Sequence, residues 1–319
     1  MRDLREPTGE LVAEDLVEER VLARFGTGLQ TTTLTPAPAG RVRWSRTPGP
    51  DHPDGWWHPG SVVERLRPDR PGARFALPGS WSARHVAWDV RGATTLAAVV
   101  RADPDADLTR RAVRDVVHGL GGLHADLRDV PAADLPPRPP GLDRLAHWLD
   151  GRPTTRAGHT WREHLFDRLG ARRRDLLRAL AADLALRADR STAAVHGWLS
   201  AGNVVVGLDE AGDPLVQVLT GPDVGRGVPE LDLGCLLGEL VEFSFRAGRH
   251  GLDPVGFDHL AHTVRALYPH GVDRDLLHAA TVLRIVLHSS DFSRFVGWDD
   301  DLLVYPGAIA DLLDAQQRP

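Results

Sequence analysis

Five polar side chains between residues 196 and 230 have the types and spacing that phosphate or acid–base chemistry uses. His196 could act as a general base, and Asn203 could hold a cation through its amide oxygen. Asp223 and Glu230 flank a short glycine loop and could form a metal-binding or acid–base pair. Arg226, at the tip of that loop, has the planar guanidinium group that binds phosphate or carboxylate. The alternative for each residue is structural: a packed histidine, an amide that braces a loop, or a solvated charge.

The sequence contains no lysine, so all 38 of its Lys and Arg side chains are arginines. This absence excludes any mechanism that needs an ε-amine, whether a Schiff base or a phosphate-binding lysine. Part of it is compositional, because the chain is rich in Ala, Arg, Gly, Pro, Leu and Asp, as GC-rich, actinobacterial-like coding would produce.

Length and composition indicate a globular protein with two lobes or two domains. The 319 residues are 42% hydrophobic and 26% charged, and the net charge of −6 gives no strong nucleic-acid footprint. The single cysteine, Cys235, cannot form an internal disulfide, which favours a reducing compartment. The N-terminal residues lack the apolar core of a signal peptide, and no run of about 18 apolar residues could span a membrane. We expect a cytoplasmic protein that binds neither nucleic acid nor membrane.

The N-terminal quarter of the chain, residues 1–84, has a weak pattern and is predicted to be irregular with a few short elements. Strands are predicted at Leu29–Leu34 and Val42–Trp44, and Val62–Leu66 is predicted to begin either a strand or a short helix. His85–Val90 alternates between apolar and polar residues and predicts a strand, which a break at Arg91-Gly92 follows.

The remainder of the chain is predicted to be helical around one hairpin. Apolar residues at helical spacing predict helices at Thr109–Ala125, Arg174–Arg187 and Leu231–Phe245, with further helices to the C-terminus. Two β-rich runs, Asn203–Leu208 and Leu215–Leu219, are joined by a polar turn that contains glycine and predict a hairpin. The candidate polar side chains therefore lie on the hairpin and on its two flanks.

The hairpin and its flanks resemble a known family. The segment that begins HGWLSAGN and ends VPELDL resembles the aminoglycoside phosphotransferase and choline kinase family, distant relatives of protein kinases. That family has the motif HGDLxxxN, a hairpin, a metal-binding aspartate and then GDPxxDL. The first motif is matched by His196, Gly197, Leu199 and Asn203, and the last by Asp232 and Leu233. Upstream, Val116–His124 is similar to the family's helix that ends LxxLH, and His85–Val90 with Gly92 is similar to its hinge strand.

The resemblance spans roughly residues 85–300 and implies a fold. It is an α+β, two-lobed protein-kinase-like fold, with a small β-rich N-terminal lobe and a larger, mainly helical C-terminal lobe. We place the N-terminal lobe at residues 1–90 and the C-terminal lobe, with the degenerate catalytic loop, at residues 91–319. In such a fold His196, Asn203 and Asp232 are expected to hold the catalytic loop in place.

The match fails where the chemistry of the family would lie. The catalytic aspartate of the family follows His-Gly, but Trp198 stands at that position and would fill the space of the acceptor hydroxyl. The aspartate that holds Mg²⁺ corresponds to Thr220, and the ATP-binding lysine has no counterpart. A positioned general base contributes about 10²–10⁴ in rate, and phosphoryl transfer depends on charge neutralisation, so little such catalysis should survive. We expect no catalytic residues, no metal site, and neither ATP nor Mg²⁺ as cofactor.

The leading hypothesis is a pseudokinase that binds or scaffolds a peptide or a partner protein. Relatives by family partner other enzymes in modified-peptide (natural-product) biosynthesis, and the chain is rich in tryptophan near the small lobe: Trp56, Trp57, Trp81 and Trp88. The predicted binding residues are Trp198, Asn203, Thr220, Asp223, Arg226 and Trp88. The alternatives are an active phosphotransferase or other enzyme with relocated catalytic acids, and a resistance or sensor protein that sequesters its ligand. Tryptophans that only fill the core are the alternative to an aromatic binding surface.

Overall fold

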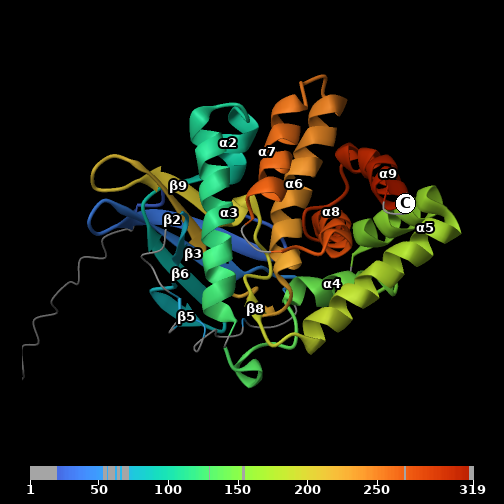
Figure 1. Ribbon diagram of the computed structural model, residues 1–319, viewed down its shortest axis with the longest axis horizontal. Helices are drawn as coiled ribbons and strands as arrows, with labels where there is room; N and C mark the ends of the chain where they lie inside the picture. The colour runs from blue at the N-terminus through green and yellow to red at the C-terminus, as the bar shows by residue number, and fades with distance from the viewer. Residues whose placement is uncertain are drawn as a thin grey trace, which may run out of the picture.

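The computed structural model describes residues 20–52, 56, 62, 65–66, 72–128, 130–152, 155–268 and 271–315. The strands gather on one side of the molecule and most helices on the other (Figure 1). Among the described residues, no helix is both long and apolar enough to cross a membrane.

The first sheet is antiparallel and has five strands in the order β1-β2-β3-β6-β5. A run of threonines favours β2, because β-branched side chains pack well on a pleated surface. The register places Trp44 of β3 opposite Trp88 of β6, and both indoles are fully buried. The strands are β1 Ala23–Gly26, β2 Gln30–Ala37, β3 Arg41–Pro48, β5 Ser80–Ser82 and β6 His85–Val90.

The second sheet is built on the predicted hairpin and has the order β4-β10-β9-β7. In the turn between β9 and β10, one carboxylate oxygen of Asp209 accepts hydrogen bonds from the N–H groups of Ala211 and Asp213. A separate pair, β8 and β11, flanks the hairpin. The strands are β4 Arg74–Ala76, β7 Thr94–Thr95, β8 Ala194–Val195, β9 Val204–Leu208, β10 Pro214–Leu219 and β11 Gly225–Arg226.

The helices form the larger lobe, and α2 and α3 pack against the hairpin sheet. The side chains of Thr95, Thr155 and Asp273 cap α2, α5 and α8 by accepting from backbone N–H groups, and α5 kinks at Gly170, where φ is +70°. The helices are α2 Leu96–Ala102, α3 Asp107–Leu127, α4 Pro140–Leu149, α5 Arg156–Arg190, α6 Pro229–Arg249, α7 Val255–Leu267, α8 Arg274–Phe295 and α9 Tyr305–Ala315. Three short 3₁₀ helices are η1 Ala132–Asp134, η2 Ala201–Asn203 and η3 Asp300–Val304.

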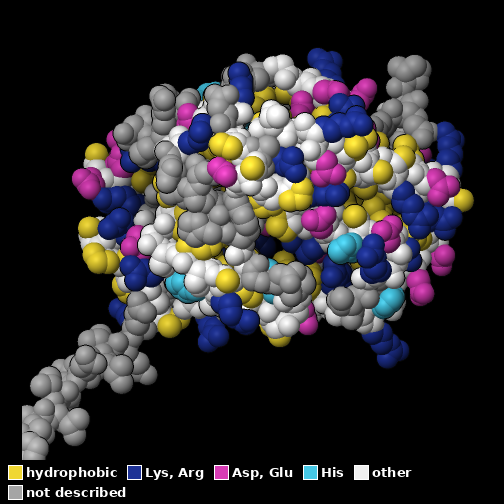
Figure 2. Space-filling model, turned by 90° about the horizontal axis from the view of Figure 1, so that it is seen from below, with side chains coloured by type: hydrophobic (Ala, Val, Ile, Leu, Met, Phe, Trp, Pro, Cys, Tyr) yellow, Lys and Arg dark blue, Asp and Glu magenta, His cyan; other side chains and the backbone are white. Residues whose placement is uncertain are grey.

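The two lobes share one apolar cluster. Val205 of β9 and Leu219 of β10 pack with Trp44 and Trp88 of the five-stranded sheet. At the centre of the helical lobe α6 packs on α8, and a side chain at Gly234 would come within 2.5 Å of the Ala280 side chain. The close α6–α8 packing therefore needs glycine at position 234. On the face shown in Figure 2, basic and acidic side chains are mixed around a central hollow.

The architecture confirms the predicted fold class and most of the predicted elements. The strand at His85–Val90 and both strands of the hairpin lie where they were expected. The strands predicted at Leu29–Leu34 and Val42–Trp44 lie in β2 and β3, but both strands are longer than predicted and β1 was missed. The reason is that polar residues on buried positions, Thr32, Thr35 and Arg46, interrupt the apolar alternation. Only part of Val62–Leu66 lies within the described residues. The lobe boundary at residue 90 stays a prediction, and β4, which precedes it, pairs with β10 beyond it.

Candidate functional site

The loop from His196 to Asn203 connects β8 to β9, and Asp232 holds its start. The carboxylate of Asp232 is fully buried and accepts from the N–H groups of His196 and Gly197, at 2.8 and 2.7 Å. Its Oδ2 atom also accepts from Nε2 of His124 at 2.9 Å. Three hydrogen bonds donated to this buried carboxylate compensate for the loss of its hydration. This is the structural role that the sequence predicts for Asp232.

His196 and Gly197 leave little freedom for this loop. The buried imidazole of His196 donates from Nε2 to the carbonyl of Leu219 at 3.0 Å, so it links the loop to the end of β10. Gly197 has a φ of +85°, and a side chain there would collide with the carbonyl of Asp223. The bonding of His196 fits a structural role better than that of a general base.

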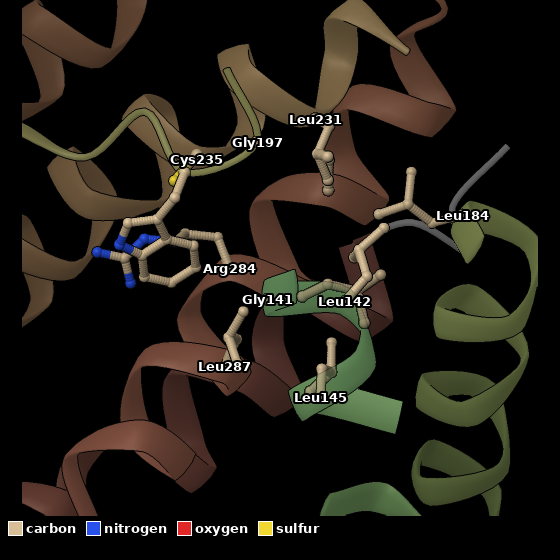
Figure 3. A pocket seen from close by; sticks show the side chains of 12 residues that line it. Gly141, Leu142, Leu145, Leu184, Gly197, Leu231, Cys235, Arg284 and Leu287 are labelled. Carbon is tan, nitrogen blue, oxygen red and sulfur yellow. The ribbon is translucent and has the colours of Figure 1, made fainter. Parts of the chain in front are cut away.

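Trp198 is the residue that the resemblance equates with the catalytic aspartate of the family, and its indole is turned into the helical lobe. The guanidinium carbon of Arg284 lies 4.7 Å from the centre of the indole ring, within the range of a cation–π contact. The half-buried indole forms one wall of an apolar cavity of about 20 Å³. Figure 3 shows Leu142, Leu184 and Leu231 lining this cavity across from Arg284. The space beside the loop is therefore lined mainly by apolar side chains.

Asn203, which the resemblance equates with a metal ligand, is fully engaged by protein atoms. Its Oδ1 atom accepts from Nη2 of Arg46 at 2.8 Å, and its Nδ2 group donates to the carbonyl of Trp198 at 2.8 Å. Arg46 belongs to β3, so this hydrogen bond crosses from one lobe to the other. The side chain of Asn203 is only 5% exposed.

Arg46 is a functional candidate that the sequence alone did not single out. Its guanidinium carbon lies 5.2 Å from the centre of the Trp88 ring, and the residue is 5% exposed. Burial lowers the pKa of Arg46 to about 10, and the negative charge of Asp223 opposes this effect. A signal was available in the sequence, because Arg46 lies in a strand near the N-terminus of a kinase-like chain without lysine.

Two indoles of the five-stranded sheet donate hydrogen bonds to backbone carbonyls of Thr220 and Gly92. Nε1 of Trp88 donates to the carbonyl of Thr220 at 2.9 Å, and Nε1 of Trp44 donates to that of Gly92 at 2.9 Å. Trp88 is 0% exposed and Thr220 is 1% exposed. The structure thus corrects the prediction that both line a binding surface, because their side chains are covered by protein.

A third contact joins the lobes at the turn between β1 and β2. The N–H of Gly28 donates to the carbonyl of Phe295, at the end of α8, at 2.7 Å. A side chain at position 28 would collide with the carboxylate of Asp51. Glycine at position 28 therefore permits a close backbone contact between the lobes.

The other predicted site residues are separated. Oε1 of Glu230 accepts from the N–H of Asp273 at 3.0 Å, so the Glu230 carboxylate is engaged at the start of α8. Arg226 belongs to β11 and donates to the carbonyl of Asp189 at 3.2 Å, so it does not stand at a flexible tip. The carboxylate of Asp223 is half-buried and acts electrostatically on Arg46 and on Arg144 of α4. The predicted acid pair of Asp223 and Glu230 does not form.

A buried charged network lies beneath Trp198. Glu242 accepts from the hydroxyl of Tyr305 at 2.6 Å and from Nδ1 of His288 at 2.8 Å. Burial would raise the pKa of Glu242, but the charges of His288 and Arg284 and these hydrogen bonds lower it to about 2. Burial raises the pKa of the neighbouring Glu239, which accepts from the N–H of Ala201 at 2.6 Å. The network thus connects α6, α8 and α9 to the loop.

Comparisons with solved structures identify the fold. A thermostable mutant of aminoglycoside phosphotransferase APH(4)-Ia, in ternary complex with AMP-PNP and hygromycin B, matches with a TM-score of 0.51 and 15% identity, over 95% of each chain. An ethanolamine kinase from Plasmodium vivax matches with a TM-score of 0.52 and 10% identity, over 97% of this chain and 84% of that one. The chain has a protein-kinase-like fold. No family model matches the sequence, and no curated protein matches it significantly.

Proposed function

We propose that this kinase-like chain is a pseudokinase whose nucleotide cleft is closed by its own side chains. The observation on which this rests is the hydrogen bond of 2.8 Å between Arg46 and Asn203. By the resemblance, Asn203 is the one metal ligand that the chain retains. A guanidinium group that already occupies its amide oxygen leaves that ligand unavailable to Mg²⁺.

Electrostatics supports the same conclusion. A divalent cation about 4 Å from a guanidinium group would be repelled by about 8 kcal/mol at an effective dielectric constant of about 20. The family's compensating carboxylate corresponds to Thr220, whose side chain is buried and neutral. Among the described residues, the carboxylate that acts electrostatically on Arg46 is that of Asp223. Arg46 therefore takes the place of the metal as the cation of this cleft.

The hinge side of the cleft supports the proposal independently. The carbonyl of Gly92, which follows the hinge-like strand β6, accepts from the indole of Trp44. A nucleotide base that used this carbonyl would have to displace a fully buried indole. Removing a buried tryptophan side chain typically costs about 3–5 kcal/mol, so such displacement is unfavourable.

The partner of this pseudokinase follows from the surface that remains. Of the five tryptophans predicted as candidates for a binding surface, Trp56 and Trp88 are buried and Trp57 lies outside the described residues, which leaves Trp81 and Trp198, both half-buried. We propose a peptide or a partner enzyme of modified-peptide biosynthesis as the occupant, by association with the family. A pull-down with and without Trp81→Ala tests this part separately.

The experiment for the pseudokinase proposal is calorimetric titration of Mg²⁺-ATP and AMP-PNP into the whole chain, with ADP release as a second readout. We expect neither low-micromolar binding nor turnover. Arg46→Met opens the Asn203 amide, while Arg43→Met, on the same strand, is the matched control because Arg43 instead pairs with Asp89 at 2.8 Å. Mg²⁺-dependent micromolar binding by the wild type, or turnover that Asn203→Ala abolishes, would favour an active phosphotransferase.

A further inference from the structure

A groove at the α7–α8–α9 end of the helical lobe lies apart from the candidate site. It has a volume of about 630 Å³ and is lined by residues of α6, α7, α8 and α9 together with the segment before α8. Pockets that bind small organic molecules usually have volumes of about 300–1,000 Å³. In Figure 1, α7 and α9 stand away from the five-stranded sheet.

The charged lining of this groove is entirely basic. His262 and Arg265 come from α7, and Arg274 and His278 from α8. Among the described residues, no Asp or Glu lines the groove, although the chain as a whole has a net charge of −6. The groove lining therefore presents two guanidinium groups and no carboxylate among the described residues.

The two arginines of the groove are not neutralised by the described residues. In the described part of the chain, no carboxylate oxygen lies within 4.0 Å of a guanidinium nitrogen of Arg265 or Arg274. Burial lowers the pKa of Arg265, and the charge of Asp258 offsets only part of that effect. The carboxylate of Asp258 meanwhile accepts from the hydroxyl of Ser244 at 2.8 Å. Many arginines elsewhere in this chain do pair with Asp or Glu, which sets these two apart.

The position of Arg274 adds a second reason to expect an anion. Arg274 is the first residue of α8, where the helix dipole is positive and disfavours a cation by about 0.3–1 kcal/mol. The neighbouring Asp273 uses its Oδ1 atom to accept from the N–H groups of Asp275 and Leu276, at 3.1 Å each. An anion in the groove would neutralise Arg274 beside this helix end.

The rest of the lining is apolar and shaped by the helices. The half-buried side chains of Val272 and Leu312 form the accessible apolar wall, and Leu237 and Leu277 are buried behind it. Nε2 of His278 donates to the carbonyl of Leu312 at 2.8 Å, which fixes the imidazole between α8 and α9. The groove thus offers hydrocarbon and guanidinium groups side by side.

We propose that this groove binds a small amphipathic anion, with a carboxylate or phosphate group between Arg265 and Arg274 and an apolar body against Val272 and Leu312. Guanidinium groups bind carboxylate and phosphate alike through paired N–H donors, so either head group would be recognised in the same way. This second site goes beyond the proposed function, because it uses none of the cleft residues.

The test is calorimetric titration of octanoate and octyl phosphate into the whole chain. Octanol supplies the apolar body without the charge, and acetate and inorganic phosphate supply the charge without the body. We expect at least one of the two amphipathic anions to bind, and the better of them identifies the preferred head group. The double variant Arg265→Ala/Arg274→Ala should weaken that binding at least about tenfold.

Arg249→Ala is the matched control, because Arg249 is an exposed arginine on α6 that does not line the groove. It should leave binding unchanged. Arg265→Gln keeps a long polar side chain and separates loss of charge from loss of folding, and it should also weaken binding. Octanol binding as tight as octanoate binding, undiminished binding by the double variant, or no binding of either anion at millimolar concentration would each overturn the proposal.

Discussion

The guanidinium of Arg46 and the amide of Asn203 meet across the lobe boundary at 2.8 Å, and both residues are about 5% exposed. The two partners are not equivalent energetically. Removing the amide leaves a buried guanidinium with an unsatisfied donor, whereas removing the guanidinium also removes the cost of burying its charge. Asn203→Ala should therefore lower the free energy of unfolding by about 1–3 kcal/mol, and Arg46→Met should lower it less.

Urea unfolding of both single variants and the double variant measures this asymmetry. In the Arg46→Met background Asn203→Ala should cost less than about 1 kcal/mol, because the stranded charge is gone. If the losses of unfolding free energy in the two single variants add up to the loss in the double variant, the two side chains do not interact in solution. Nucleotide titrations of the same variants report whether the freed amide then binds Mg²⁺-ATP.

Asp232 offers a prediction about the loop itself. Asp232→Asn replaces one acceptor oxygen by an NH₂ group. Depending on how the amide is turned, that group faces either the N–H of Gly197 or the donors of His196 and His124. We expect a loss of about 2–4 kcal/mol of stability, together with faster amide exchange in residues 196–203. Asp89→Asn, a change at a more exposed carboxylate that pairs with Arg43, is the control and should cost about 1 kcal/mol or less. Equal losses for the two variants would contradict the structural role of Asp232.

The local motifs of this chain could be predicted from the sequence, and the contacts across the cleft could not. The turn chemistry and the β-rich runs of the hairpin act over a few residues, so β9 and β10 were predicted within one or two residues of their bounds. Such features depend on neighbours in the sequence. The structural role of Asp232, in contrast, is what the resemblance to the kinase-like family implies.

Arg46 and Asn203, by contrast, are 157 residues apart, and nothing in the local pattern of β3 indicates which partner its arginine has. The burial of Trp88 depends on how the five-stranded sheet packs against β9 and β10, which the sequence does not specify. Arg226 was predicted at a free loop tip because two glycines flank it, yet its strand pairs with β8. Such errors arise where tertiary packing overrides local propensity.

Restoring the missing acid should not restore catalysis. Trp198→Asp returns the residue type that the resemblance implies, but the new carboxylate would lie near the Arg284 guanidinium, and Thr220 would still supply no metal carboxylate. We expect no ADP release above background from this variant with Mg²⁺-ATP. Trp198→Phe, which keeps an aromatic ring over Arg284, is the folding control. Its melting temperature should be closer to that of the wild type than the melting temperature of Trp198→Asp is. Turnover by Trp198→Asp would show that only one residue separates this chain from an active enzyme.

Glu242 gives the stability of the helical lobe a defined dependence on pH. It is 1% exposed and faces His288 and Arg284 of α8 and Tyr305 of α9, with Arg246 on its own helix. Its pKa falls from the ordinary 4.5 to about 2 in the folded chain, so the stabilisation is fully present above about pH 4.5 and is lost as the pH falls toward 2. The shift corresponds to stability on the order of 3 kcal/mol.

The difference between the wild type and Glu242→Gln isolates this contribution, because Glu239 titrates in both proteins and its raised pKa has the opposite effect on stability. Urea unfolding at about pH 7 and about pH 3 should show a large cost of the substitution at the higher pH and a smaller cost at the lower one. Glu163→Gln, at an acid on α5 for which no hydrogen bond or ion pair is found among the described residues, should change neither value. A cost for Glu242→Gln that is independent of pH would mean that the buried carboxylate is not the charged partner of His288 and Arg284.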